Sequence, residues 1–255
     1  MTAIEPRLAK RRKGVREDRA RGRLKWVLVI LFVVLTVVGG VWLIRSPILS
    51  IRSVTITGAS ASDPAASVAM LGMGQGTPTI DVDAGAIEAA IEADPWVRDA
   101  TVDVSWPGTV AIAVAEHTPF ATVRAADGWV RVASDGSVLM SGPPLDGAPL
   151  ISIDAGPVTA GYSLTNPLIV GALEFSAALP ADLAAQIELA TDGEGLAATL
   201  LGHSIILGRP SEMADKAAVL VALLESGIEP DAVINLIAPS RPAITNPQPL
   251  LEVEE

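Results

Sequence analysis

The chain contains no cysteine among its 255 residues, which excludes disulfides, thiolate nucleophiles and thiolate-bound metals. A domain outside the cytoplasm can fold without disulfides when its core is large enough, so this absence assigns no compartment. Histidine is almost as scarce, because His117 and His203 are the only two. A zinc site would need carboxylates to complete it, and we expect neither a metal nor a cofactor.

Lysine and aromatic residues are also rare. Aromatic residues make up 4% of a chain that is 50% hydrophobic, so its core must be mainly aliphatic. Beyond residue 25 the only lysine is Lys216, which we expect on an exposed face of a helix over residues 212–225.

Charge is distributed unevenly along the chain. Ten basic residues and three acidic ones precede residue 26, whereas 8 basic and 26 acidic residues follow from Arg45 onward. Two such opposite parts usually occupy different surroundings. The basic segment 1–25 could bind nucleic acid or lipid, but a topology signal resting on anionic headgroups is the interpretation we favour.

Residues 26–44, WVLVILFVVLTVVGGVWLI, form an uncharged apolar stretch. As a helix they would span roughly 29 Å, close to the thickness of the bilayer's hydrocarbon core. Trp26 and Trp42 stand near its ends, where indole rings favour the interface. A soluble core helix rarely lacks a polar face, and a signal peptide has a shorter apolar region with a cleavage site. We therefore expect an uncleaved single-pass anchor with a cytoplasmic N-terminus.

Alternation and capping residues predict a β-α-α-β-β order after the anchor. A strand over 51–57 precedes two helices, capped by Asp63 and by Asp83. Two strands follow, over 97–106 with Val102, Val104 and Trp106 on one face, and over 109–116. The pair Pro107-Gly108 predicts the turn between them.

The remainder predicts a mixed, largely antiparallel β domain with helices, so the fold class is α+β. Helices are expected over 167–178 and 212–225, and the last strand over 233–237. The prolines that follow cannot stay inside a sheet. We expect short strands around residues 128–132, 135–139, 150–153, 187–189, 196–200 and 204–207.

No motif for catalysis is convincing. Gly72 to Gly76 lacks the spacing of a phosphate-binding loop, and we interpret it as a connector. The sequence Gly202-His203-Ser204 begins like a nucleophile elbow, but it lacks the closing glycine and lies in a strand pattern. Asp81 and Asp83 fit helix capping better than cation binding.

Three segments resemble the bacterial cell-division family FtsQ (DivIB). They are DPWVRDATV at 94–102, SWPGTV at 105–110 and EHTPFA at 116–121. Weaker similarities follow at 132–139, at 206–208 with Lys216, and at 233–242. The signature residues are Pro95, Trp96, Val97, Trp106, Pro107, Glu116 and Pro119.

The resemblance implies a POTRA domain at 50–119 and a β domain at 120–245, and we expect a flexible acidic tail at 246–255. It also implies a non-enzymatic, type II membrane scaffold at the division septum. Its partners would be FtsB- and FtsL-like single-pass proteins and the FtsW/FtsI-like peptidoglycan synthase complex, with no nucleic acid and no small-molecule substrate.

We expect such a partner to add a strand to the edge of the last strand. Substitutions at Leu236 or Ile237 should then weaken partner capture while the melting temperature barely changes. An ordinary terminal strand blunted by prolines is the simpler interpretation. The expected contact residues are Leu236, Ile237, Ala238, Ser240, Arg241 and Ile244.

Two other functions compete with this one. A POTRA-containing factor for exported polypeptides usually carries several such domains before a barrel, and this chain shows one. A membrane-anchored envelope hydrolase would need convergent polar groups, with Ser204 and His203 as the nearest candidates.

Overall fold

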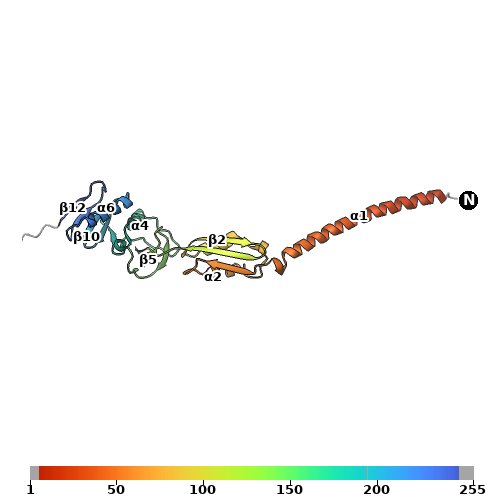
Figure 1. Cartoon of the computed structure of the whole chain (residues 1–255), viewed down its shortest axis with the longest axis horizontal. Coiled ribbons are helices and arrows are strands. Elements are labelled where there is room, and N and C mark those ends of the chain that lie inside the picture. Colours follow the sequence, from red (N-terminus) through yellow and green to blue (C-terminus); the bar gives the residue numbers. More distant parts are fainter. Residues whose placement is uncertain (1–5, 194, 247–255) are drawn as a thin grey trace, which may run out of the picture. The chain divides into compact units, whose positions relative to one another are not determined.

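The computed structural model describes residues 6–193 and 195–246, with only the backbone for residues 6–24. It begins with a long helix, α1 (Pro6–Ile44), drawn as one continuous ribbon in Figure 1. Within α1, Lys25–Ile44 is long and apolar enough to cross a membrane, and none of it is buried. This exposure agrees with the expected anchor, since the core helix of a soluble protein is mostly buried. The helix starts well before Trp26, so it also takes in most of the basic segment.

A three-stranded sheet follows, in the order β1-β3-β2, with α2 and α3 between β1 and β2 in sequence. The predicted β-α-α-β-β order is therefore confirmed. Both capping predictions hold, because Asp63 Oδ1 accepts from Ala66 N–H at 3.0 Å and Asp83 Oδ1 from Ala86 N–H at 3.1 Å. The elements are η1 (Pro47–Leu49), β1 (Ser53–Thr57), α2 (Pro64–Met70), η2 (Thr79–Asp81), α3 (Ala84–Glu92), β2 (Val97–Ser105) and β3 (Thr109–Glu116).

Trp106 does not share a buried face with Val102, contrary to the prediction. β2 ends at Ser105, and Trp106 lies in the turn to β3, where it is 57% exposed. The Trp106–Pro107 peptide bond is cis, and the Gly108 N–H donates to the Ser105 carbonyl at 3.1 Å. The predicted turn is thus present, but it ends the alternation one residue earlier than expected.

The remaining chain forms a nine-stranded sheet in the order β12-β11-β10-β9-β8-β7-β4-β5-β6. Five strand pairs are antiparallel and three are parallel, namely β4 with β7, β7 with β8 and β10 with β11. The mixed, largely antiparallel sheet is confirmed. The strands are β4 (Ala121–Ala125), β5 (Gly128–Val132), β6 (Val138–Ser141), β7 (Leu150–Ile151), β8 (Glu188–Thr191), β9 (Leu196–Leu200), β10 (His203–Gly208), β11 (Val233–Asn235) and β12 (Ala243–Thr245).

Three helices accompany this sheet: α4 (Pro167–Ala178), α5 (Ala181–Ala184) and α6 (Met213–Glu225). α4 and α6 pack against each other, and both add side chains to one hydrophobic core with the strands. Ile169 and Phe175 of α4 and Leu220 of α6 are completely buried in it. The core is mainly aliphatic, as the composition predicted.

The chain divides into two compact units. The first takes residues up to Thr55, Val68–Ile87 and Val102–Ile112; the second takes Ile56–Ser67, Glu88–Thr101 and the chain from Ala113 onward. This division passes through the three-stranded sheet, so the bounds 50–119 and 120–245 stay predictions. Of the expected acidic tail 246–255, only Asn246 lies within the described residues.

Candidate functional site

The last strand of the nine-stranded sheet is the candidate site. β12 pairs antiparallel with β11, with Ile244 opposite Ile234. All three residues of β12 are exposed, and no other described strand pairs with its outer side. An edge strand of this kind offers unpaired backbone N–H and C=O groups to an added strand. The chemistry available here is therefore main-chain hydrogen bonding.

The prediction that β11 forms the edge is wrong, because β12 covers it. Leu236 is completely buried and its N–H donates to the Ile206 carbonyl at 2.8 Å, so it belongs to the core. The Ile237 N–H donates to Asn235 Oδ1 at 3.1 Å, which bends the chain out of the strand. Three of the other expected contact residues, Ala238, Ser240 and Arg241, lie exposed in the turn between β11 and β12, and Ile244 lies on the edge itself.

A groove of about 790 Å³ lies beside this turn. Ile237, which is 56% exposed, lines it, and its side chain lies over Gly208, where a Cβ would stand only 3.0 Å from Ile237 Cγ1. Gly208 also has a φ of +66° at an irregular step in the pairing of β10 with β9. The other lining residues are Asp192, Gly193, Gly195, Ile206, Arg209 and Ser211.

Lys216 is buried, which contradicts the expected exposed position. Its side chain is 1% exposed, and its Nζ donates to the carbonyls of Leu207 at 2.7 Å and Arg209 at 2.9 Å. Burial lowers the pKa of the ammonium, although the nearby Glu212 carboxylate opposes this effect. Lys216 therefore fastens the end of β10, and with it one wall of the groove, to helix α6.

His203 and Ser204 do not form a nucleophile–base pair. Both lie on β10, where His203 is buried and Ser204 is exposed on the opposite face. His203 Nδ1 has no hydrogen-bond partner among the described residues. The described residues also contain no group of three metal-ligating side chains. Gly72 to Gly76 lies in the connection between α2 and η2, as a connector should.

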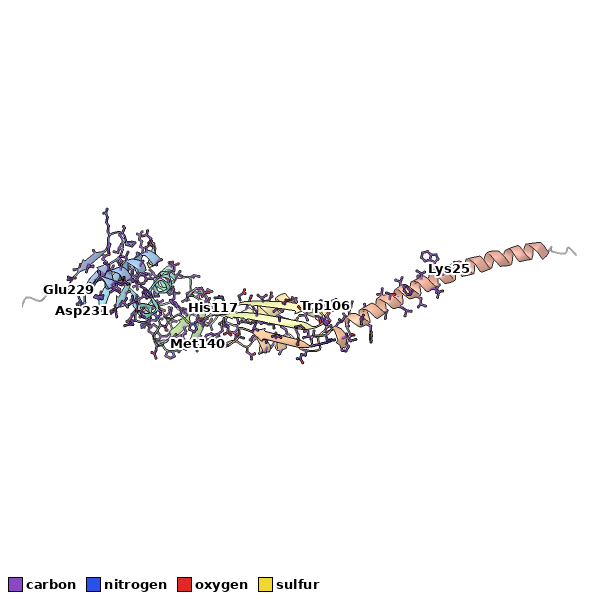
Figure 2. All side chains as sticks on the ribbon, in the orientation of Figure 1. Lys25, Trp106, His117, Met140, Glu229 and Asp231 are labelled. Carbon is purple, nitrogen blue, oxygen red and sulfur yellow. The ribbon has the colours of Figure 1, made fainter. Side chains whose placement is uncertain are left out.

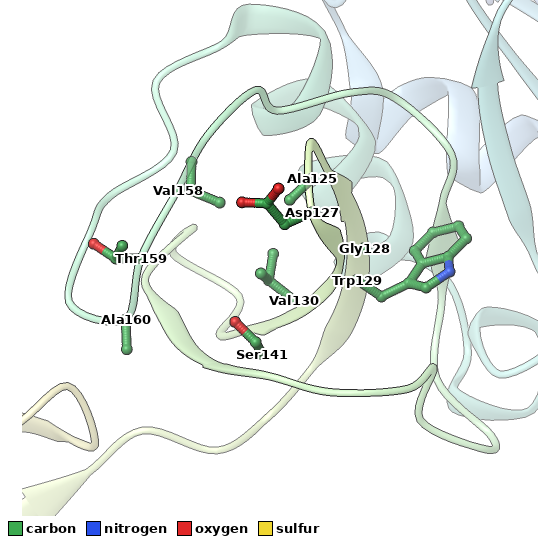
Figure 3. Close-up of a pocket in the computed structure, with 9 residues that line it drawn as sticks. All are labelled: Ala125, Asp127, Gly128, Trp129, Val130, Ser141, Val158, Thr159 and Ala160. Carbon is green, nitrogen blue, oxygen red and sulfur yellow. The ribbon is translucent and has the colours of Figure 1, made fainter.

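A second hollow lies at the β4–β5 turn, with a volume of about 390 Å³ (Figure 3). Asp127 is the only ionisable residue among those that line it, and its carboxylate points toward Val158. The indole of Trp129 points away from the hollow in Figure 3. A single carboxylate without a partner acid or base does not make a hydrolytic site.

Glu116, one of the signature residues, binds residues 60–62 through its carboxylate. Its carboxylate accepts hydrogen bonds from the backbone N–H groups of Ser60, Ala61 and Ser62, and from both serine hydroxyls. Desolvation alone would raise the pKa of Glu116, but the hydrogen bonds from Ser60 and Ser62 outweigh it and hold this pKa well below its usual range. Glu116 thus ties the end of β3 to the segment that follows β1.

The residues around Glu116 are also structural. Val97 is buried, Trp96 N–H donates to Asp94 Oδ1 at 3.0 Å, and the Trp96 carbonyl accepts from His117 N–H at 2.8 Å. Pro95 lies against Gly161, whose Cβ position is 3.6 Å from Pro95 Cγ. Pro119 stands between β3 and β4, and Pro107 lies in the turn after Trp106.

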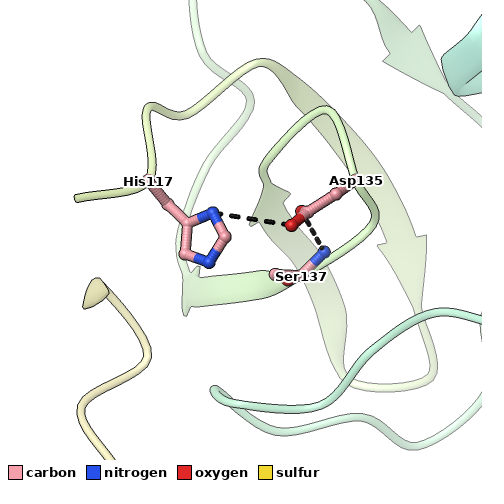
Figure 4. A network of polar contacts seen from close by, with 3 residues as sticks. All are labelled: His117, Asp135 and Ser137. Atoms are coloured by element: carbon pink, nitrogen blue, oxygen red, sulfur yellow. Dashed lines mark hydrogen bonds and ion pairs between the residues drawn. The ribbon is translucent and has the colours of Figure 1, made fainter. Parts of the chain in front are cut away.

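His117 faces the turn between β5 and β6. Its Nδ1 lies 3.7 Å from Asp135 Oδ2, while Asp135 Oδ1 accepts from Ser137 N–H at 3.0 Å (Figure 4). Desolvation works to raise the pKa of Asp135, but hydrogen bonds from Ser137 and the His117 charge lower it overall. The contact therefore links the segment after β3 to the turn between β5 and β6.

Known proteins resemble this chain both in one domain and along most of its length. Residues 49–117 match the model of the FtsQ-type POTRA domain. Three similar proteins, each called cell division protein FtsQ, come from Mycobacteroides abscessus, Corynebacterium glutamicum and Mycolicibacterium smegmatis. The identities are 26%, 26% and 28%, over 91%, 78% and 91% of this chain and 73%, 87% and 68% of the respective relatives.

The family model covers the POTRA domain alone. The similarity to the relatives from Mycobacteroides abscessus and Mycolicibacterium smegmatis extends over 91% of the chain, so it also includes most of the nine-stranded sheet. The candidate anchor, the confirmed β-α-α-β-β order and the mixed sheet are consistent with one architecture. The FtsQ-type POTRA domain and the similarity along most of the chain support the FtsQ (DivIB) family of bacterial cell-division proteins.

Proposed function

We propose that the chain is a non-enzymatic, single-pass scaffold of the bacterial division complex that captures a partner on the edge of β12. The partner would be an FtsB- or FtsL-like membrane protein, through which the scaffold connects to an FtsW/FtsI-like peptidoglycan synthase. The main observation behind this proposal is that β12, the terminal strand of the nine-stranded sheet, is exposed.

Strand addition is the physical mechanism that suits this edge. A partner segment in extended form gains affinity from main-chain hydrogen bonds and selectivity from alternate side chains. Ile244 is 43% exposed on β12, and Ile237 is exposed beside the groove. Together they supply apolar anchors on either side of the turn that links β11 and β12.

Partner capture tests the site directly. In the full-length protein, Ile244→Asp should reduce co-purification of an FtsB-like partner, because a carboxylate opposes an apolar strand at this edge. Tyr162→Asp is the matched control, since Tyr162 is 50% exposed and belongs to no strand. Undiminished capture by Ile244→Asp would remove this site.

Depletion in cells tests the division role. We expect cells to lengthen or branch without completing septa, and a fluorescent fusion to gather at the septum. Normal division after depletion, with no second family member in the genome, would contradict the scaffold function.

The proposed orientation keeps the basic segment in the cytoplasm and the two folded parts outside. It follows from the excess of basic residues before Trp26. Replacing Arg11, Arg12 and Lys13 by Glu should disturb insertion, as read by protease accessibility of the folded part. Native topology after replacement of all ten basic residues would count against the electrostatic origin of the orientation.

A hydrolase function has no support from the geometry of His203 and Ser204, which lie on opposite faces of β10. Ala substitutions at these two positions should leave division unchanged, provided that His203→Ala folds. The one POTRA domain matched in the chain also favours a division scaffold over a factor for exported polypeptides.

A further inference from the structure

Large apolar side chains are exposed at one end of the three-stranded sheet. Ile48 is 57% exposed, Ile80 54% and Trp106 57%. Trp106, labelled in Figure 2, lies in the turn between β2 and β3. Neither the fold nor the edge-strand site uses these side chains. Apolar residues gathered on a surface mark an interaction site.

Hydrogen bonds connect the chain segments to which Ile48, Ile80 and Trp106 belong. The Ile51 N–H donates to the Thr77 carbonyl at 2.8 Å, and the Thr79 hydroxyl donates to the Leu49 carbonyl at 2.7 Å, which fixes η2 and Ile80. On the other side, the Arg52 N–H donates to the Gly108 carbonyl at 2.8 Å, which fixes the turn of Trp106. The three segments therefore meet at residues 49–52, and we call Ile48, Ile80 and Trp106 the apolar end.

The segment that gathers them is the direct continuation of the membrane helix. α1 ends at Ile44, and η1 begins at Pro47 with its Ser46 hydroxyl accepting from Ile48 N–H at 3.2 Å. The chain from Arg45 to Arg52 can span at most about 28 Å when fully extended, and its helical turn shortens it further. The apolar end is thus tethered close to the membrane surface where the helix emerges.

The chemistry of this end suits the layer of lipid headgroups. Indole rings favour the membrane interface, and Arg side chains can reach phosphates while their stems lie on apolar surface. Arg45 and Arg52 are both exposed in this segment, and one guanidinium nitrogen of Arg52 donates to the Ile48 carbonyl at 2.6 Å. A largely apolar groove of about 500 Å³ is lined by residues of the last turns of α1, from Val37 to Trp42, and by Arg45, Ser46 and Pro47.

We propose that the apolar end rests in the outer headgroup layer of the membrane that α1 crosses, with Ile48, Ile80 and Trp106 inserted. This proposal rests on the proposed placement of the folded part outside the membrane. The occupant is the phospholipid surface, because the apolar end continues directly from the membrane-spanning helix. The contact would hold the three-stranded sheet upright at a fixed height above the bilayer.

The absence of cysteine makes a depth measurement straightforward. The full-length protein, in phospholipid nanodiscs without partners, would carry one environment-sensitive fluorophore on a single introduced cysteine. We expect probes at Ile48→Cys, Ile80→Cys and Trp106→Cys to be quenched by lipids with a nitroxide at the headgroup. A probe at Leu35→Cys should respond to a nitroxide deep in the acyl chains, and one at Tyr162→Cys to neither.

The outcomes separate this proposal from the function it rests on. Probes at Ile80 and Trp106 that behave like Tyr162, while Leu35 is quenched, would overturn the lipid contact and leave the anchor intact. An unquenched Leu35 probe would overturn the anchor and with it the scaffold function. Probes that become shielded only when an FtsB- or FtsL-like partner is added would assign the surface to protein and overturn the lipid contact.

A charge substitution gives a second, independent readout. Ile80→Asp in the Trp106→Cys background should cause a loss of headgroup quenching, because the two side chains share one surface. Tyr162→Asp in the same background is the control and should change nothing. Equal quenching with and without Ile80→Asp would show that Trp106 is near lipid for another reason.

Discussion

The Nζ of Lys216 on α6 donates a hydrogen bond of 2.7 Å to the carbonyl of Leu207 on β10. A second bond of 2.9 Å reaches the carbonyl of Arg209, just beyond the strand. Leu207 is the last residue but one of β10, and Arg209 follows the strand directly. Lys216 therefore supplies a hydrogen-bond donor to both carbonyls at the end of the strand. These two hydrogen bonds explain why the charged side chain of Lys216 can be buried, because its ammonium group meets carbonyl acceptors there.

Lys216→Met should destabilise the full-length protein by about 1–3 kcal/mol, because it removes the donor to the buried Leu207 carbonyl and to the partly buried Arg209 carbonyl. Denaturant unfolding in mild detergent measures this change. Arg241→Met, at an exposed turn position, is the control and should stay within about 0.5 kcal/mol. A variant as stable as the wild type would show that the ammonium does not hold the strand end.

Leu236 and Ile237 should respond oppositely although they are neighbours. Leu236→Ala should cost about 2–5 kcal/mol, because it opens a cavity in the core, whereas Ile237→Ala should cost far less. Conversely, Ile237→Ala should reduce partner capture without unfolding the protein. Thermal unfolding together with co-purification separates the two effects, and equal melting temperatures would contradict the buried position of Leu236.

Glu116→Gln should destabilise the protein by about 1–3 kcal/mol at neutral pH, because the charged acceptor of several hydrogen bonds is lost. The folded-state pKa of Glu116 lies below that of the unfolded chain, so its contribution is complete above about pH 4.3 and declines as the pH falls. The stability difference between wild type and variant should therefore shrink on acidification below that pH.

Unfolding midpoints measured across this range test the linkage at Glu116. Glu188→Gln is a suitable control, since the Glu188 carboxylate accepts one hydroxyl hydrogen bond, from Ser152 at 3.1 Å. A difference for Glu116→Gln that stays constant from neutral to acidic pH would contradict the lowered pKa.

Gly108→Ala should destabilise the turn that carries Trp106 by more than about 1 kcal/mol. Gly108 has a φ of +152°, and a Cβ there would overlap the carbonyl of Ser50. Gly128→Ala is the matched control, because its φ of +131° is also positive but open space surrounds its Cβ position. If both variants lose the same stability, only backbone conformation matters, and the close approach to Ser50 contributes nothing.

Local patterns predicted much of the fold. The apolar stretch 26–44 predicts the anchor because a bilayer demands a continuous run of such residues. Asp63 and Asp83 mark two helix starts because each carboxylate needs only a backbone N–H three residues away. The strand predicted over 109–116 is present, and Val110, Ile112 and Val114 are buried at alternate positions along it. Each of these signals is contained within a short segment.

The failures concern contacts between distant segments. β12 has three residues flanked by prolines, which is too short for an alternation signal, and it exists because it pairs with β11. Trp106 follows an alternating strand, but the turn takes it out of the pattern. No local rule shows that Lys216 would donate to the carbonyls at the end of β10.

Residue patterns alone predict the candidate membrane helix, the order of the elements and the resemblance to the family, since each depends on neighbouring residues or on matching motifs. The open edge at β12, the burial of Lys216 and the exposed apolar side chains of η1, η2 and the β2–β3 turn are visible only in the folded chain. Strand pairing and burial depend on partners far away along the chain, which no short pattern contains.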